Sequence, residues 1–217
     1  MYIQHLDTFL IAITILTLTP GLDTALVIKN TSRSGAKDGC VTSFGICSGL
    51  FIHAGFSAVG ISAILLQSAQ LFQVMKWIGA AYLIWLGFSS LRATYRGVKG
   101  ISVPADHTYR EFSAMRSLRE GFLSNVLNPK TAIFYLAFLP QFIDPNHSLF
   151  LQSFMMAGIH FVIANVWQCG LSIAINSAQK LVKNSSMLTW MEGLTGTVLI
   201  ALGIKLLLDE GNSTPTT

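Results

Sequence analysis

The sequence predicts an all-α integral membrane protein with about six transmembrane helices, arranged as two inverted three-helix repeats with a proline-broken first helix in each half. Three observations support this fold class. The 217 residues are 52% hydrophobic and only 11% charged, whereas soluble domains have roughly 25% charged residues. The charges gather in short stretches separated by long apolar runs. Similar features also recur in the two halves of the chain.

Six apolar runs are long enough to cross a membrane, because about 20 residues of helix span a hydrocarbon core of about 30 Å. They are residues 6–28, 41–66, 72–91, 121–142, 149–175 and 188–208. Backbone groups in lipid must be paired within the structure, and the runs lack the alternation of apolar and polar residues that a membrane β-barrel needs. The runs are therefore predicted to be helices.

Basic residues mark the connections after the first, third and fifth runs. They are Lys29, Arg33 and Lys37, then Arg92, Arg96, Lys99, Arg110, Arg116 and Arg119, then Lys180 and Lys183. The positive-inside rule places these odd-numbered loops in the cytoplasm and both termini outside. A re-entrant first segment would instead place the N-terminus inside. Because the basic residues lie in separate loops, no nucleic-acid partner is predicted.

The longest basic connection divides the chain. We expect a first membrane repeat at residues 1–92, a basic cytoplasmic linker at 93–118, a second membrane repeat at 119–208 and a disordered polar tail at 209–217. The first helix of each half carries a proline, Pro20 or Pro129, and the second carries a histidine, His53 or His160. Two three-helix halves in one chain have opposite topology, which is typical of secondary transporters.

Proline inside a helix removes a hydrogen bond and clashes with the preceding turn. The motifs at residues 19–21 (Thr-Pro-Gly) and 128–130 (Asn-Pro-Lys) are therefore predicted to break their helices. Half-helix ends and freed carbonyls then become available to a ligand. A purely structural kink is the alternative interpretation.

Two charged residues lie at these breaks. Lys130 is near the middle of the fourth run, where a charge is costly, and Asp23 follows the first break. We hypothesise that both face one aqueous cavity and bind the two ends of a zwitterionic amino acid, or pair with each other in its absence. The alternative is an interfacial Asp23 near Lys29 and a structural ion pair. The predicted substrate-binding residues are Thr19, Pro20, Gly21, Asp23, Asn125, Asn128, Pro129 and Lys130.

A polar stripe runs along the second helix of each half. The two stripes consist of Gly45, Gly49, His53 and Ser57, and of His160, Gln168, Ser172 and Asn176 with Asn165 beside them. The glycines predict close helix packing and make a homodimer feasible. The candidates for proton coupling are Asp23, His53 and His160, although a buried neutral histidine is an equally good interpretation of either ring.

The sequence contains no Walker-type phosphate loop, no appropriately placed Ser/His/Asp set and no metal-ligand cluster. No cofactor, metal or enzymatic activity is therefore predicted, and transport energy would come from ion or proton gradients. The alternatives are a membrane-embedded enzyme that uses Asp23 or the histidines as acid and base, and a non-transporting membrane subunit.

The motifs at residues 19–24 (Thr-Pro-Gly-Leu-Asp-Thr) and 121–130 (Gly-Phe-Leu-Ser-Asn-Val-Leu-Asn-Pro-Lys) resemble signatures of the LysE/RhtB family of amino-acid exporters. The resemblance extends through residues 35–53, 76–87 and 138–142, nearly the whole chain. It implies efflux of an amino acid or derivative across the bacterial inner membrane by proton antiport. Leu22 departs from the family, which usually has a second proline there, whereas Asp23 is retained.

Overall fold

The computed structural model describes residues 3, 5–67, 69–95, 111–177 and 185–208. In this part of the chain the regular elements are all helical, apart from an isolated antiparallel bridge between Ile3 and Ile143. The elements are α1 (Leu6–Leu18), α2 (Leu22–Ser34), α3 (Ala36–Gln67), α4 (Ala69–Tyr95), α5 (Ala114–Val126), α6 (Pro129–Ala137), the 3-10 helix η1 (Leu139–Phe142), α7 (Leu149–Ser177) and α8 (Ser185–Leu208).

The predicted all-α membrane class is confirmed. Ala36–Gly60 within α3 and Leu149–Ile175 within α7 are each long and apolar enough to cross a membrane. The α1–α2 pair passes the same test jointly and is bent by 49° at its break, so it is a third candidate span. The predicted runs at residues 72–91 and 188–208 fall within α4 and α8.

The predicted linker at residues 93–118 is helical at both ends, because α4 continues to Tyr95 and α5 begins at Ala114. Residues 96–110 lie outside the described part of the chain, and so does the predicted tail at 209–217. The linker and the tail therefore remain predictions.

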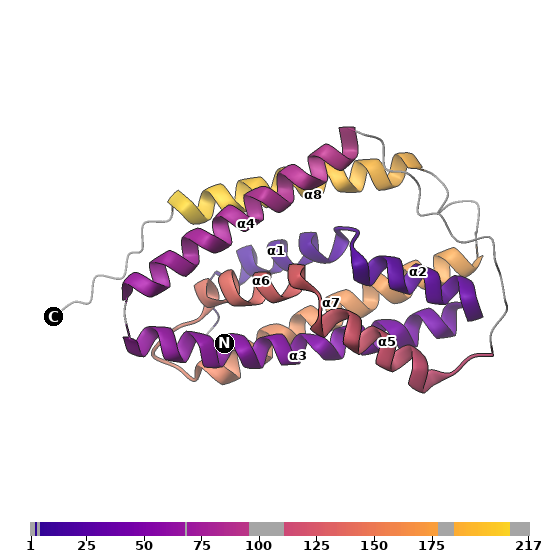
Figure 1. Cartoon of the computed structure of the whole chain (residues 1–217), viewed down its shortest axis with the longest axis horizontal. Helices are drawn as coiled ribbons and strands as arrows, with labels where there is room; N and C mark the ends of the chain where they lie inside the picture. Colours follow the sequence, from indigo (N-terminus) through magenta and orange to yellow (C-terminus); the bar gives the residue numbers. More distant parts are fainter. Residues whose placement is uncertain (1–2, 4, 68, 96–110, 178–184, 209–217) are drawn as a thin grey trace.

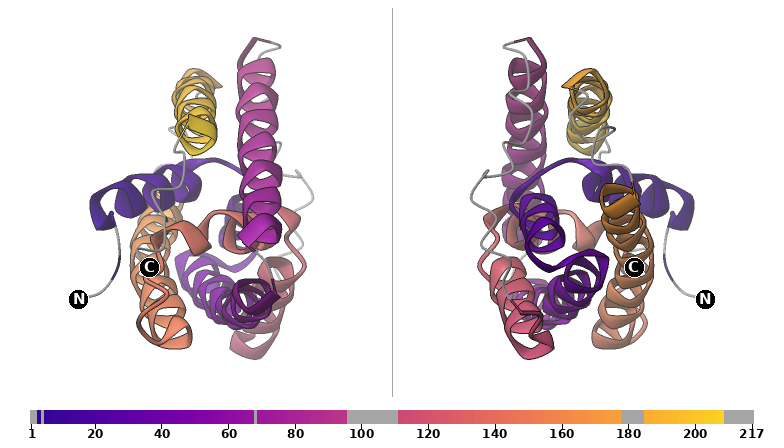
Figure 2. Two further views of the ribbon diagram at one scale, coloured as in Figure 1. Left: turned by 90° about the vertical axis from the view of Figure 1, so that its left-hand side faces the viewer. Right: turned by 90° about the vertical axis from the view of Figure 1, so that its right-hand side faces the viewer.

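Helices α4 and α8 lie side by side as a pair next to the other helices (Figures 1 and 2). Glycines allow their backbones to approach closely. A Cβ atom added at Gly87 would lie 2.6 Å from the carbonyl oxygen of Gly196, and one added at Gly203 would lie 2.9 Å from that of Ala80. Helices α4 and α8 are thus packed directly against each other.

The stripe on α3 is confirmed as a packing surface, and its partner is the α5–α6 segment. Gly45 contacts the backbone of α5 at Leu118, and a Cβ atom at Gly49 would lie 2.7 Å from Oδ1 of Asn125. Farther along α3, Ser57 Oγ donates to the carbonyl oxygen of Tyr135 at 2.7 Å. The absence of side chains at the glycines therefore sets how close α5 lies to α3.

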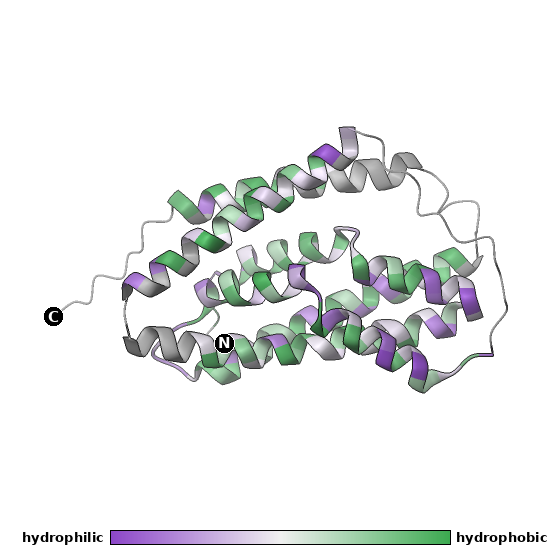
Figure 3. Cartoon of the chain, in the orientation of Figure 1, coloured by the Kyte–Doolittle hydropathy of each residue, from purple (hydrophilic) through white to green (hydrophobic). Residues whose placement is uncertain are grey.

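An apolar cluster fills the end of the molecule where α1 begins and η1 lies. The rings of Phe9 and Phe142 meet edge to face with centroids 5.4 Å apart, and those of Phe138 and Phe142 are 4.9 Å apart. All three side chains are buried. The hydrophilic residues concentrate at the opposite end, where α2 ends and α3 and α5 begin (Figure 3). The two ends of the structure thus differ in chemistry, with packed aromatic rings at one end and hydrophilic residues at the other.

Adding a methyl group at the α4–α8 contact tests this packing. We expect Gly87→Ala to lower the free energy of unfolding by about 1–3 kcal/mol, because the new Cβ would overpack the contact. Gly55→Ala is the matched control, since a Cβ atom there meets nothing within 4 Å. The measurement is the thermal unfolding midpoint of each variant in detergent. Equal midpoints for the two variants would contradict the packing described here.

Candidate functional site

The break in the first half separates α1 from α2 at Thr19, Pro20 and Gly21. Thr19 ends α1, and its hydroxyl donates back to the carbonyl oxygen of Ile15 at 2.7 Å. Gly21 is extended and precedes the first turn of α2. The last carbonyls of a helix lack partners within that helix, so the break leaves acceptors at the end of α1.

The break in the second half separates α5 from α6. Pro129 is the first residue of α6, a position where its missing N–H is not needed. Asn128 caps this helix, because its Oδ1 accepts a hydrogen bond of 3.0 Å from the backbone N–H of Lys130. The Asn-Pro pair is thus a sequence-encoded helix start, and it orients Lys130 in the first turn.

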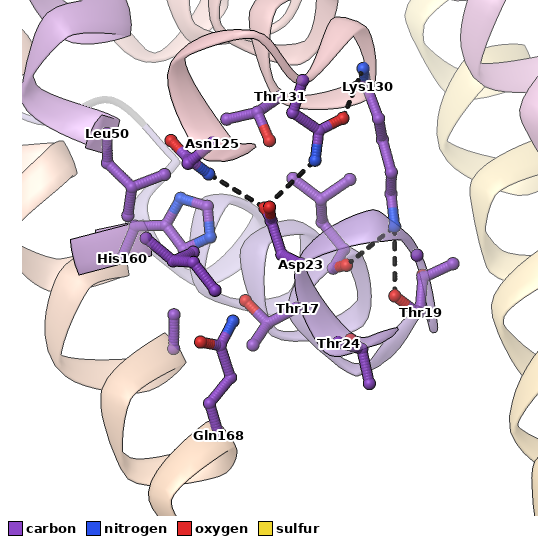
Figure 4. Close-up of a pocket in the computed structure, with 15 residues that line it drawn as sticks. Thr17, Thr19, Asp23, Thr24, Leu50, Asn125, Lys130, Thr131, His160 and Gln168 are labelled. Atoms are coloured by element: carbon purple, nitrogen blue, oxygen red, sulfur yellow. Dashed lines mark hydrogen bonds between the residues drawn. The ribbon is translucent and has the colours of Figure 1, made fainter. Parts of the chain in front are cut away.

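The side chain of Lys130 reaches the first break. Its Nζ donates to the carbonyl oxygens of Leu16 at 3.3 Å and Thr19 at 3.1 Å (Figure 4). These carbonyls belong to the last turn of α1 and to its cap. A cation from the second half therefore satisfies acceptors that the break in the first half leaves open.

Asp23 forms the reciprocal contact. Its carboxylate accepts hydrogen bonds from Ser124 Oγ at 2.9 Å, Asn125 Nδ2 at 3.0 Å and Asn128 Nδ2 at 3.0 Å. All three donors are uncharged and come from the end of α5 and the cap of α6. Asp23 also lies in the first turn of α2, where the helix dipole favours a negative charge.

One cavity lies where the two breaks meet, and both charged side chains face it (Figure 4). Its lining is formed by Leu16, Thr17, Thr19, Gly21, Asp23, Thr24, Ile46, Leu50, Asn125, Asn128, Lys130, Thr131, His160, Ala164 and Gln168. Most of the predicted binding residues therefore come together. Pro20 and Pro129 are outside this lining and instead form the breaks that shape it.

The two histidines occupy different positions. His160 on α7 lines the cavity, and its Nδ1 is 3.1 Å from the hydroxyl of Tyr135. His53 on α3 is buried away from the lining, and its Nε2 donates to the carbonyl oxygen of Asn125 at 2.9 Å. His53 therefore positions the segment that carries Asn125, whereas His160 is available to the cavity.

Several lining residues were not among the predicted site residues. Thr17 and Gln168 line the cavity, and Ser124 holds Asp23. For Gln168 a signal was present, because it follows His160 by two helical turns and lies on the same face of α7. Two other members of that stripe pack elsewhere: Asn165 accepts from Ser43 Oγ at 3.1 Å, and Ser172 contacts Thr31.

A second polar cluster joins α2, α3 and α5 at the basic end. Arg33 forms ion pairs with Asp38 at 3.0 Å and Glu120 at 3.1 Å. Asn30 donates to Glu120 at 2.9 Å, and Ser117 donates to Asp38. The side chain of Asp38 is completely buried. This arginine cluster, comprising Asn30, Arg33, Asp38, Ser117 and Glu120, was not predicted.

Among the described residues, no three His, Cys, Asp or Glu side chains are placed to hold a metal ion. The chemistry that the cavity offers is instead that of ligand binding. It presents a carboxylate, an ammonium group, amides and hydroxyls around a small space. Such a set is complementary to a small ligand that carries charges of both signs.

Comparison with known proteins places these features in a family. The family model described as LysE type translocator matches residues 14–210. An uncharacterized membrane protein of Bacillus subtilis is 35% identical over 196 residues, which cover 87% of this chain and 91% of that protein. An uncharacterized membrane protein of Vibrio cholerae is 32% identical, over 91% of this chain and 94% of that protein.

A further relative is named for its activity. The homoserine/homoserine lactone efflux protein of Salmonella typhimurium is 26% identical over 198 residues, which cover 91% of this chain and 93% of that protein. No solved structure matches this chain.

The arginine cluster yields a stability prediction. We expect Arg33→Met to lower the free energy of unfolding by about 3–5 kcal/mol, because it leaves the buried Asp38 carboxylate without its cation. The double variant Arg33→Met/Asp38→Asn should lose less than the sum of the two single changes. Thermal unfolding midpoints in detergent measure both effects, with the exposed Arg92→Met as control. An Arg33→Met midpoint equal to that of the control would contradict the interpretation.

Proposed function

The chain belongs to the LysE-type translocator family, and from this premise we propose that it exports an amino acid or a close derivative across the bacterial inner membrane. The observation that carries the proposal is the meeting of Asp23 and Lys130 at one cavity between two broken helices. A fixed negative and a fixed positive group in a small cavity match the ammonium and carboxylate of an amino acid. The efflux activity named for the Salmonella relative supports the same direction of transport.

In the proposed complex the substrate ammonium lies against Asp23 and the substrate carboxylate against Lys130. The carboxylate takes the place of the Leu16 and Thr19 carbonyls as acceptor for the Lys130 Nζ. Helix α6, which carries Lys130 in its first turn, begins beside the cavity, and its positive N-terminal end complements a carboxylate. These contacts use groups that every α-amino acid has, so they define the common part of the substrate.

We further propose that six membrane spans form two inverted repeats. The spans would be α1–α2, α3 and α4 in the first half, and α5–α6, α7 and α8 in the second. In each half a broken first span precedes two long helices, which supports this arrangement. The basic residues of α2, α3 and α5 gather at one end of the structure, which supports placing this end in the cytoplasm.

Alternating access then requires the two closures to open in turn. The arginine cluster joins the first half to α5 on the proposed cytoplasmic side, and the Phe9, Phe138 and Phe142 cluster closes the other side. Opening toward the cytoplasm separates Arg33 from Glu120, and opening outward separates Phe9 from Phe142. Rigid-body motion of one half against the other accomplishes both.

Proton antiport completes the proposal. Asp23 is the proposed exchange site, because it faces the cavity where the substrate ammonium group is proposed to bind, so a proton and the substrate would compete for the same carboxylate. His160 lines the same cavity and is the second candidate. His53 acts on Asn125 and so takes part only indirectly.

Exchange of labelled amino acids in proteoliposomes tests the substrate site. We expect Asp23→Asn and Lys130→Met each to slow exchange by about tenfold or more, because each removes one charged partner of the zwitterion. Asp7→Asn and Lys205→Met are the matched controls, since both residues are exposed and outside the cavity. Wild-type exchange rates in both cavity variants would contradict the proposed site. Net flux by the wild type also separates a carrier from an enzyme or a passive subunit.

An imposed pH gradient tests the coupling. Liposomes loaded with substrate should release it faster when the outside is more acidic than the lumen, because inward proton movement drives outward substrate movement. A protonophore should remove the acceleration, and reversing the gradient should slow release. The Asp23→Asn variant is the control, because it has no titratable group at the proposed exchange site. If initial efflux rates were independent of the gradient, proton antiport would be wrong even if the substrate site were right.

A further inference from the structure

Three buried side-chain oxygens at the cavity have no hydrogen-bond partner within the described part of the chain. They are Thr17 Oγ1, Asn125 Oδ1 and Gln168 Oε1. The Asn125 side chain belongs to a residue only 1% exposed, and Gln168 is 5% exposed. Buried polar atoms are normally paired, so three unpaired oxygens around one cavity indicate that a ligand supplies hydrogen-bonding groups there.

The three oxygens lie in two places. Asn125 is beside Asp23, to which its Nδ2 donates at 3.0 Å. Gln168 extends from α7 into the cavity, with Thr17 of α1 facing it (Figure 4). If the substrate ammonium lies against Asp23, Asn125 Oδ1 is available to the same group. Gln168 and Thr17 then remain for the only part of an amino acid not yet assigned, its side chain.

The character of these two groups defines the side chain that fits. An amide and a hydroxyl each donate and accept hydrogen bonds, and neither carries a charge. The adjoining lining residues Ile46, Leu50 and Ala164 are apolar. A charged substrate side chain would therefore be buried there without a counterion, which is costly, whereas an aliphatic one would leave the amide unsatisfied.

We propose that Gln168, assisted by Thr17, is the specificity-determining residue of the carrier and selects amino acids whose side chains bear an uncharged hydrogen-bonding group such as a hydroxyl. This inference rests on the proposed export function and extends it to the part of the substrate that Asp23 and Lys130 do not contact. Gln168 acts by binding the substrate side chain and by discriminating among side chains.

A matched pair of substrates tests the inference. Homoserine and norvaline have nearly the same shape and differ by a hydroxyl in place of a methyl group. We expect wild-type proteoliposomes to exchange homoserine about tenfold faster than norvaline, and lysine more slowly than homoserine. In Gln168→Met, which keeps the length of the side chain without its amide, the homoserine-to-norvaline ratio should fall toward one.

Gln141→Met is the matched control, because Gln141 is outside the cavity and its amide donates to the carbonyl oxygen of Ala137. Its ratio should equal that of the wild type. If Gln168→Met does not fold, Thr17→Val removes the opposing hydroxyl at constant shape and should also lower the ratio.

The outcomes separate the two proposals. A wild-type ratio near one, or a wild-type ratio that Gln168→Met or Thr17→Val leaves unchanged, would overturn the role of Gln168 while leaving amino-acid export intact. No exchange of any amino acid by folded wild-type protein would overturn the export function itself, and the specificity proposal with it.

Discussion

The two helix breaks supply each other's missing hydrogen-bond partners across the interior, and the cavity depends on these reciprocal contacts. Backbone groups in lipid need partners, so a broken membrane helix is tolerated only where another element supplies them. Here Lys130 from the second break donates to carbonyls of the first, and Asp23 from the first accepts from Ser124, Asn125 and Asn128 at the second. Each break therefore stabilises the other, and together they place opposite charges at one cavity.

The same reciprocal hydrogen bonds explain how Asp23 and Lys130 are stabilised at the cavity and can still bind a ligand. Asp23 is stabilised by three neutral donors and a helix N-terminus, and Lys130 donates to two carbonyls. Hydrogen bonds with these uncharged groups offset part of the desolvation penalty of each charged side chain. A ligand can replace such contacts one at a time, whereas a tight direct ion pair would resist entry. The site is thus suited to reversible binding.

The breaks and their charged residues could be predicted from the sequence because their causes are local. Proline in an apolar run, Asn before Pro129 and a lone lysine in the fourth run each have a direct physical consequence. The separation of His53 from His160 could not be predicted, because it depends on which face of α3 meets α5. The arginine cluster was also missed, since Arg33 and Glu120 are brought together only by packing of distant helices.

Helix α5 links the two regions mechanically. Its 13 residues carry Ser117 and Glu120 of the arginine cluster near the start, and Ser124 and Asn125 of the Asp23 site near the end. A short continuous helix moves as a unit, so a displacement that separates Glu120 from Arg33 also shifts two of the three donors to Asp23. The glycines of α3 let α5 lie directly against it, so the two helices share a tight contact along this surface. Helix α5 therefore connects the arginine cluster with the contacts that are proposed to hold the substrate.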